Sequence, residues 1–389
     1  MSTILGISCF YHDAAAAIVR DGMLLAAAEE ERFSRRKHDF GFPQLAIQFC
    51  LERAGITAKE LDYVVFYEKP FLKFERIFLT QLQGFPYTLD TFRRSMTNWL
   101  LDKLWVKQTI LGALDMPEEK ILFSQHHLSH AASAFFCSPF QESAILTVDG
   151  VGEWTTTMIS HGRATWDGQG RNELKLLSEI RFPHSLGLLY SVFTAFLGFE
   201  VNEGEYKVMG MAPYGTPRYV DKVWQVIHQE KDGSFWLGMD YFSYHYSAKQ
   251  AYSRKFLQLF GEPRDRRAPF VTHEAWTRDA TTKESDLRSS QHYADLGASI
   301  QKVTEEVILN LARRAHEVTQ SPRLCLAGGV ALNSVANGRI LRETPFSEVF
   351  IQPAAGDSGG AVGAALWAYH VLLQKPRKFV MEHAYWGQQ

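Results

Sequence analysis

Two histidines at helical spacing are the clearest candidates for metal binding in the sequence. Residues 126–130 read HHLSH, and residues 131–135 (AASAF) favour a helix. On a helix, His126 and His130 lie four positions apart on one face, so both imidazoles can reach a single ion. His127 points about 100° away and stands where zinc proteases carry glutamate, which excludes that motif. A purely structural histidine pair is the alternative.

Two aspartates in turns are candidates to complete such a metal site. Asp149 ends an apolar strand in the run VDGVG, and Asp357 lies between an expected strand at 349–351 and a final helix of small residues. Two histidines and two aspartates form a mixed nitrogen and oxygen set, which suits iron, manganese or zinc better than calcium. Alternatively, each aspartate caps a helix or shapes a turn. Spacing alone does not bring the four together.

Glycine-bearing loops indicate a place for a nucleotide. Residues 324–333 read as a strand that enters the pair Gly328-Gly329 and then a helix, where phosphates can lie against backbone N–H groups. The pattern is neither GxGxxG nor a P-loop, and a tight turn without a ligand is the alternative. In the loop 202–210, Glu205 and Lys207 are positioned for a ribose hydroxyl and a phosphate, or both are solvated. The basic run 32–38 fits an exposed face or a small phosphorylated substrate.

The strands and turns that must position these residues occur in two similar copies along the sequence. Apolar strands at 4–8, 14–19 and 23–28 are joined by turns, and the pattern returns at 144–148 and 155–159, with a further turn expected at His161-Gly162. Two copies indicate a duplicated α/β unit with a cleft between the halves. The alternative is that the two hairpins are similar only because hairpins are common.

Periodicity predicts helices over residues 43–54 and 295–316. We expect one unit at residues 1–142 with a helical insert at about 72–114, and a second at 143–389 with an insert at about 231–289. Either insert is a lid, an acceptor pocket or, more simply, core.

Composition excludes several classes of protein. The 389 residues are 46% hydrophobic and 22% charged, as in globular proteins with a core. The net charge of −2 argues against a surface for nucleic acids. The N-terminus has no signal-peptide pattern, and the longest apolar tract, 359–373, is shorter than the ~20 residues that span a bilayer. The four cysteines form no CxxC pair, so we expect reduced thiols. Together these observations lead us to expect a cytoplasmic enzyme with no membrane partner.

Six segments, taken together, resemble the nodulation-protein-U / antibiotic O-carbamoyltransferase family. They occur in order over nearly the whole chain: YHDAAA (11–16), EEERFSRRKH (29–38), HHLSHAASAF (126–135), VDG (148–150), KVMGMAPYG (207–215) and GGVALN (328–333). The resemblance implies a duplicated actin-like ATPase (ribonuclease H-like) fold, with two subdomains around a nucleotide cleft. It also implies transfer of a carbamoyl group from carbamoyl phosphate, through carbamoyl-adenylate, to a hydroxyl of a small molecule such as a sugar or antibiotic.

The resemblance also implies roles for particular residues. His126, His130, Asp149 and Asp357 would hold Fe(II), with Mn, Mg or Zn as alternatives, and the ion would anchor the phosphates of ATP or carbamoyl-adenylate. The nucleotide-binding set would be Gly150, Glu205, Lys207, Gly328, Gly329, Val330 and Asn333. His12 and Asp13 would face the acceptor hydroxyl, and Lys37 would lie near the end derived from carbamoyl phosphate. A histidine, with an ordinary pKa of about 6.5, suits the base that this reaction needs.

One departure from the family is the length of the chain. Family members continue beyond residues 383–387 into a domain that makes carbamoyl-adenylate, whereas this chain stops at Gln389. We therefore expect a truncated form, a subunit that needs a separate carbamoyl-adenylate-forming partner, or a degenerate copy. The alternatives are an enzyme like the tRNA threonylcarbamoyl transferases, which the net charge disfavours, a non-catalytic nucleotide-binding subunit, and a sugar kinase of the same fold superclass.

Overall fold

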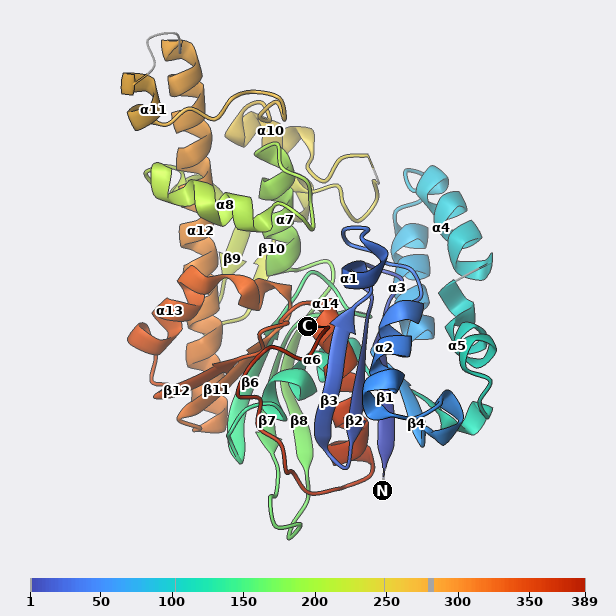
Figure 1. The fold of residues 1–389 in the computed structure, drawn as a ribbon. Coiled ribbons are helices and arrows are strands. Elements are labelled where there is room, and N and C mark those ends of the chain that lie inside the picture. Colours follow the sequence, from blue (N-terminus) through green and yellow to red (C-terminus); the bar gives the residue numbers. More distant parts are fainter. Residues whose placement is uncertain (1, 102, 248, 279–282, 389) are drawn as a thin grey trace.

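The computed structural model describes residues 2–101, 103–247, 249–278 and 283–388, and its core contains two five-stranded sheets (Figure 1). The first sheet has the order β3-β2-β1-β4-β5. Its strands are β1 (Thr3–Ser8), β2 (Ala15–Arg20), β3 (Met23–Glu29), β4 (Tyr63–Phe66) and β5 (Ile121–Phe123). β1 pairs antiparallel with β2 and parallel with β4, so the hairpin strands lie on one side and the parallel strands on the other.

The second sheet repeats the first strand for strand. Its order is β12-β11-β6-β7-β8, with β6 antiparallel to β7 and parallel to β11. Its strands are β6 (Glu142–Val148), β7 (Thr155–Arg163), β8 (Glu173–Arg181), β11 (Arg323–Ala327) and β12 (Glu348–Ile351). The shared order and strand directions confirm the predicted duplication and the actin-like ATPase (ribonuclease H-like) fold. The chain up to α6 is termed the N-terminal half, and the chain from β6 onward the C-terminal half.

Two helices lie against each other between the sheets. α6 (His126–Phe135) packs on β6, β7 and β11, whereas α14 (Asp357–Trp367) packs on β1 and β2 (Figure 1). Small residues permit this closeness: a Cβ at Gly6 would lie 1.9 Å from the Ala361 carbonyl oxygen, and one at Gly363 would lie 1.7 Å from that of Ser129. Both helices therefore begin near the same point between the sheets.

Other helices cover the outer faces. α2 (Gln44–Ala54) packs on β2 and β3, as its apolar spacing predicts. α12 (Glu284–Thr319) packs on β6 and supports α7 (Leu186–Phe196), α8 (Glu205–Met211) and α13 (Ser334–Glu343). The sequence predicts this helix only from residue 295, because its first turns (ESDLRSSQHYAD) carry little apolar periodicity.

The two expected inserts differ in structure. Around 72–114 the chain forms α3 (Pro70–Gln83), α4 (Leu89–Leu101) and α5 (Val106–Leu114). The region around 231–289 is less regular, and the short elements in and just before it are β9 (Ile227–Gln229), β10 (Phe235–Leu237), α10 (Arg254–Phe260) and α11 (His273–Arg278). The remaining short elements are α1 (Glu31–Ser34), α9 (Val220–Val223), η1 (Ala58–Glu60), η2 (Lys103–Trp105), η3 (Glu118–Lys120), η4 (Ala212–Tyr214), η5 (Met239–Tyr241), η6 (Gly329–Leu332) and the π-helical η7 (Ala368–Leu372). The division at residue 142 stays a prediction.

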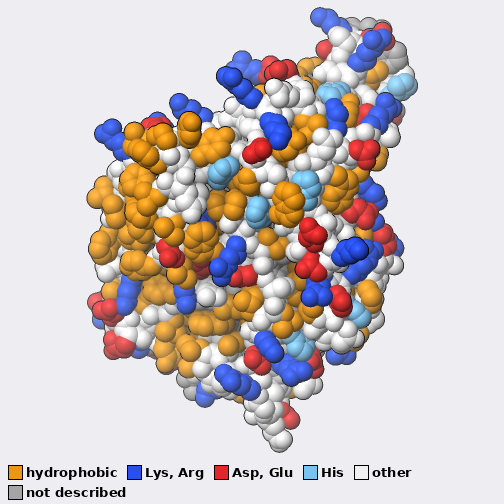
Figure 2. All heavy atoms as spheres, turned by 180° about the vertical axis from the view of Figure 1, so that it is seen from behind, with side chains coloured by type: hydrophobic (Ala, Val, Ile, Leu, Met, Phe, Trp, Pro, Cys, Tyr) orange, Lys and Arg blue, Asp and Glu red, His pale blue; other side chains and the backbone are white. Residues whose placement is uncertain are grey.

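The α3–α5 region is only partly core. Figure 2 shows hydrophobic side chains gathered on the side of the molecule that α3–α5 occupy in Figure 1. Trp99 is buried, but Phe71, Phe85, Tyr87, Leu101 and Trp105 are exposed. Among the described residues, no helix combines the length and apolar character needed to cross a membrane.

One turn prediction is wrong. His161 and Gly162 lie inside β7, where Gly162 pairs with Ser143 on one side and Leu174 on the other. A Cβ at Gly162 would come within 2.9 Å of the Phe135 and Ile145 side chains. The glycine makes room for the end of α6 on the sheet rather than forming a turn.

Candidate active site

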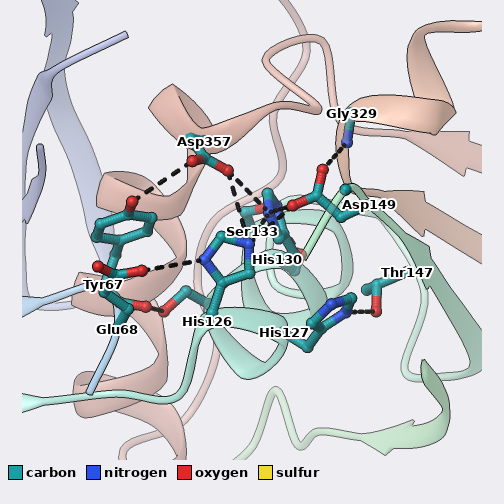
Figure 3. Close-up of polar contacts among 12 residues, drawn as sticks. Tyr67, Glu68, His126, His127, His130, Ser133, Thr147, Asp149, Gly329 and Asp357 are labelled. Atoms are coloured by element: carbon teal, nitrogen blue, oxygen red, sulfur yellow. Dashed lines mark hydrogen bonds and ion pairs between the residues drawn. The ribbon is translucent and has the colours of Figure 1, made fainter. Parts of the chain in front are cut away.

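The four predicted metal ligands converge at the starts of the two central helices and the end of β6 (Figure 3). His126 is the first residue of α6, His130 follows one turn later, Asp149 follows β6, and Asp357 is the first residue of α14. The Nε2 atoms of the two histidines lie 3.1 Å apart. His126 Nε2 lies 2.9 Å from Asp149 Oδ2, and His130 Nε2 lies 3.5 Å from Asp357 Oδ1.

This donor set fits a divalent transition-metal ion. Metal–ligand bonds of about 2.0–2.2 Å place neighbouring donor atoms about 2.8–3.6 Å apart in octahedral or tetrahedral sites, close to the spacings that the four side chains already have. Two imidazole nitrogens and two carboxylates converging in a buried space carry more lone pairs than protons can satisfy. A cation resolves that imbalance.

The pKa values of the four side chains show how strongly they interact. Burial disfavours charge on either imidazole, but the facing carboxylates outweigh burial and raise the pKa of His126 and His130 above the usual range. Burial opposes charge on the carboxyls too, yet the imidazoles hold the pKa of Asp149 well below its usual range and lower that of Asp357 to about 2. The four groups therefore compensate one another as two imidazolium cations and two carboxylate anions, and a bound metal ion would take the place of the imidazole protons.

Neighbouring groups orient three of the four ligands (Figure 3). The Tyr67 hydroxyl donates to Asp357 Oδ2 at 3.4 Å, and the Gly329 backbone N–H donates to Asp149 Oδ1 at 2.9 Å. Glu68 Oε2 lies 3.7 Å from His126 Nδ1, the nitrogen that faces away from the other ligands. Such outer contacts fix ring orientation in metal sites. His127 is placed elsewhere, with Nδ1 2.7 Å from the Thr147 hydroxyl, as its helical position predicts.

A cavity of about 310 Å³ opens beside the ligands. Its lining comes from both halves of the chain and includes many of the predicted site residues: His12, Asp13, Asp149, Gly150, Glu205, Gly329, Val330 and Asn333. A site of this size, between halves and next to a charged cluster, fits a small ligand such as a nucleotide.

His12 and Asp13 form a hydrogen-bonded pair at the wall of the cavity. His12 Nδ1 donates to Asp13 Oδ2 at 2.8 Å, which leaves Nε2 as the acceptor, 3.8 Å from Asp357 Oδ2. Burial lowers the affinity of His12 for a proton, but Asp357 and Asp13 outweigh burial and raise the pKa of His12 to about 9. The base form of His12 therefore depends on what compensates the charge of Asp357.

The glycine pair shapes the opposite wall. Gly328 has φ +89°, and a Cβ there would lie 2.3 Å from the Val148 carbonyl oxygen, so only glycine fits this turn after β11. Asn333 accepts from the Ala336 N–H at the start of α13 and exchanges hydrogen bonds with Gln301. The predicted glycine loop is therefore attached both to a metal ligand, through Gly329, and to α12.

Two predicted residues lie outside the cavity, and a third lines it with its carboxylate already engaged. Lys37 and Lys207 are exposed and do not line the cavity, and the Lys207 ammonium lies 5.7 Å from the Tyr206 ring centre. Glu205 lines the cavity, but its Oε1 already accepts from the Ser191 hydroxyl and the Asn202 N–H. Their roles stay predictions.

Sequence reasoning missed two side chains near His12. His38, next to Lys37, points to Asp13, and Glu203, two residues before Glu205, faces His38. Both lie in segments that the motifs had marked, but no spacing rule tells which side chain of a loop turns inward.

Comparison with known proteins gives a consistent result. The family model described as Carbamoyltransferase N-terminus matches residues 3–366. An uncharacterized protein of Synechocystis is 50% identical over 97% of this chain and 58% of its own length. Nodulation protein NolNO of Sinorhizobium fredii is 34% identical over 97% of this chain and 49% of its own length. The chain thus spans about half the length of the curated relatives it matches.

Among solved structures, component A of the (R)-2-hydroxyglutaryl-CoA dehydratase of Acidaminococcus fermentans is similar with a TM-score of 0.45 and 14% identity, over 95% of this chain and 98% of that one. The fold assignment rests on the strand order of the two sheets and not on this likeness. The match of the family model over most of the sequence shows that the chain belongs to the carbamoyltransferase N-terminal family.

Proposed function

We propose that the chain transfers a carbamoyl group from carbamoyl-adenylate to a hydroxyl of a small acceptor, such as a sugar or an antibiotic-like molecule. Family membership supports the transfer of a carbamoyl group. One observation supports the adenylate as the donor: a candidate base, Asp149 of the four-ligand metal cluster and a glycine loop all line one cavity.

The transfer step assigns a task to each wall of the cavity. The acceptor oxygen bonds to the carbamoyl carbon while its proton moves to His12 Nε2. The bond from that carbon to the phosphate oxygen breaks, and its electron pair leaves with AMP. Asp13 holds the His12 ring so that Nε2 is the proton acceptor.

The metal cluster and the glycine loop act on the leaving group. His126, His130, Asp149 and Asp357 would hold Fe(II), or Mn, Mg or Zn in its place, and the bound ion would supply charge neutralisation for the AMP phosphate. Gly329, Val330 and Asn333 border the space proposed for the adenosine. Closeness of the two walls fixes donor and acceptor together, which lowers the entropic part of the barrier.

The donor requires an earlier step. Carbamoyl phosphate and ATP would be converted to carbamoyl-adenylate in a step that we assign to a separate region or subunit. The curated relatives that extend well beyond the matched region support this division of labour. A cytoplasmic location, where carbamoyl phosphate and ATP are at hand, belongs to the same proposal.

A direct assay supplies synthetic carbamoyl-adenylate to the chain loaded anaerobically with Fe(II), with a panel of sugars and aminoglycosides as acceptors. We expect a carbamoylated acceptor and AMP in equal amounts, as measured by mass spectrometry and chromatography. Nucleotide binding without product across the panel would contradict the proposal and favour a non-catalytic subunit. A phosphorylated acceptor formed from ATP would indicate a kinase, and carbamoylation confined to tRNA would indicate an RNA-modifying enzyme.

A further inference from the structure

A chain of four side chains extends outward from His12. His12 Nδ1 donates to Asp13 Oδ2 at 2.8 Å, and His38 Nδ1 donates to Asp13 Oδ1 at 2.7 Å. The other ring nitrogen of His38, Nε2, lies 3.3 Å from Glu203 Oε1. Each oxygen of Asp13 is therefore engaged by a histidine, and His38 stands between two carboxylates.

The backbone at this chain adopts uncommon conformations. Asp13 has φ 50°, His38 has φ 53°, and Asn202, next to Glu203, has φ 68°. Residues other than glycine rarely adopt this left-handed region, and they are concentrated at functional sites, where surrounding contacts hold them. Three such residues beside one hydrogen-bonded chain indicate that the placement of these side chains is tightly specified.

Further hydrogen bonds hold the two loops of the N-terminal half together. The Ala14 N–H donates to the Asp39 carbonyl at 2.8 Å, and the His38 N–H donates to Glu31 Oε2 at 2.8 Å. The loop that carries His38 is thereby attached to the loop that carries Asp13. Asp13 accepts hydrogen bonds on both oxygens and Glu31 accepts one from the backbone, so these two carboxylates are satisfied without an added cation.

The last contact of the chain joins the two halves. Glu203 lies between α7 and α8 of the C-terminal half, on the cavity wall with Asn202 and Glu205, whereas His12, Asp13 and His38 belong to the N-terminal half. Both side chains of the His38–Glu203 pair are partly exposed, so the pair contributes little to stability. Because His38 contacts both Asp13 and Glu203, the pair nevertheless makes the position of His38 beside Asp13 depend on the position of the C-terminal half's cavity wall.

From this arrangement we propose that His38 is a positioning residue, which fixes the ring of His12 through Asp13, and that Glu203 connects this fixation across the cavity to the nucleotide-side wall. The inference rests on the proposed function, since positioning matters only if His12 is the base. A ring held by one hydrogen bond to a mobile carboxylate samples orientations in which Nε2 misses the acceptor proton. Misplacement of a reacting group by 1 Å costs about 100-fold in rate.

Variants that tolerate the left-handed backbone separate side-chain and backbone effects. His38→Gly removes both contacts, whereas His38→Asn places an amide N–H near the Nδ1 position and can still donate to Asp13. We expect His38→Gly to lower kcat for transfer from carbamoyl-adenylate by about 100-fold, with the acceptor KM within about 2-fold, and His38→Asn to recover most of that loss.

The contact across the cavity has its own matched pair. Glu203→Gln removes the charge that faces His38, and Glu200→Gln removes a charge from an exposed position of the same loop. We expect kcat to fall about 5-fold in the first variant and to stay at the wild-type value in the second. Equal effects of His38→Gly and His38→Asn, or of the two glutamate variants, would overturn the inference. The glutamate pair keeps the test open if His38→Gly does not fold.

Nuclear magnetic resonance separates this inference from the proposed function. In the chain loaded with diamagnetic Zn(II) and labelled with ¹⁵N at histidine, the Nδ1 proton of His12 should give a downfield signal, assigned by its loss in His12→Gln. The signal should broaden in His38→Gly and persist in His38→Asn. If wild type transfers no carbamoyl group but the signal responds in this way, the function fails and the positioning stands. A signal indifferent to His38 would overturn the positioning even in an active enzyme.

Discussion

The two halves of the chain have the same strand order but carry different chemistry at equivalent places. The loop after β1 holds His12 and Asp13, whereas the loop after β6 holds Asp149 and glycines. After β4 comes Glu68, buried and paired at 2.6 Å with Lys73, whereas glycines follow β11. Duplication thus determines where chemistry can be placed, and each copy determines which chemistry is placed there.

The central helices show the same division. α6 follows β5 and begins with a histidine, and α14 follows β12 and begins with an aspartate. With His130 and Asp149, each half supplies two of the four candidate metal ligands. The metal cluster is therefore shared, whereas the candidate base belongs to the N-terminal half and the glycine loop to the C-terminal half.

Breaking the shared cluster should have the largest effect. Asp357→Asn removes a buried anionic ligand, and we expect both metal content and carbamoyl transfer to fall by at least about 100-fold. Metal content is measured by mass spectrometry after gel filtration. The control is His127→Asn, which can keep the contact to Thr147 and should retain the ion. Full metal content in Asp357→Asn would contradict the shared cluster.

Removing His12, the candidate base of the N-terminal half, should slow carbamoyl transfer without changing nucleotide binding. We expect His12→Gln to lower kcat by about 10²- to 10⁴-fold, because no other described side chain offers an acceptor nitrogen at its place. Binding of a non-hydrolysable ATP analogue, measured by calorimetry, should stay at the wild-type value. A matching loss of nucleotide affinity would show that the two walls do not have separate tasks.

Altering the glycine loop should have the opposite effect, weakening nucleotide binding while leaving kcat nearly unchanged. In Gly329→Ala, the new Cβ would lie 3.0 Å from Asp149 Oδ1 and would enter the cavity wall. We expect the nucleotide Kd to rise about 10-fold, or about 1.4 kcal/mol, with kcat at saturating donor within a few-fold. Gly210→Ala, where a Cβ meets nothing within 4 Å, is the control. A large fall in kcat with unchanged Kd would contradict the division.

A buried histidine outside the site should affect stability only. His370 stacks on Phe136 at a ring distance of 4.5 Å, and burial lowers its pKa to about 4. Between about pH 6.5 and 4 the unfolded chain binds this proton and the folded chain does not, so stability falls as pH falls through that window, by about 3 kcal/mol at most. His370→Asn should flatten the acid limb of the urea stability curve without changing transfer. An unchanged acid limb would show that His370 does not contribute.

Patterns that depend on regular geometry were predictable from the sequence. The spacing of His126 and His130 on a helix, the exclusion of His127 and the strand–turn–strand copies all follow from fixed periods of helix and strand. The structure brings Asp149 and Asp357 to the same histidines because duplicated sheets place strand ends and helix starts together.

What the sequence could not provide depends on irregular backbone and long-range packing. A positive φ at His38 turns that side chain toward Asp13 and leaves Lys37 exposed, and residue types alone do not specify this choice. Glu203 meets His38 only because two halves distant in sequence close on one cavity. The sequence pattern predicted a turn at Gly162. Glycine is needed there because α6 packs closely on β7, and a sequence alone does not reveal such a contact.

The central claim is that the shared metal cluster holds the nucleotide in the cavity between the two walls. Calorimetry of ATP binding under anaerobic conditions, with and without Fe(II), on wild type and His130→Ala tests it most directly. We predict binding that requires the ion and is lost in His130→Ala. Binding of equal strength without the ion and in the variant would contradict the claim and reduce the histidine pair to a structural role.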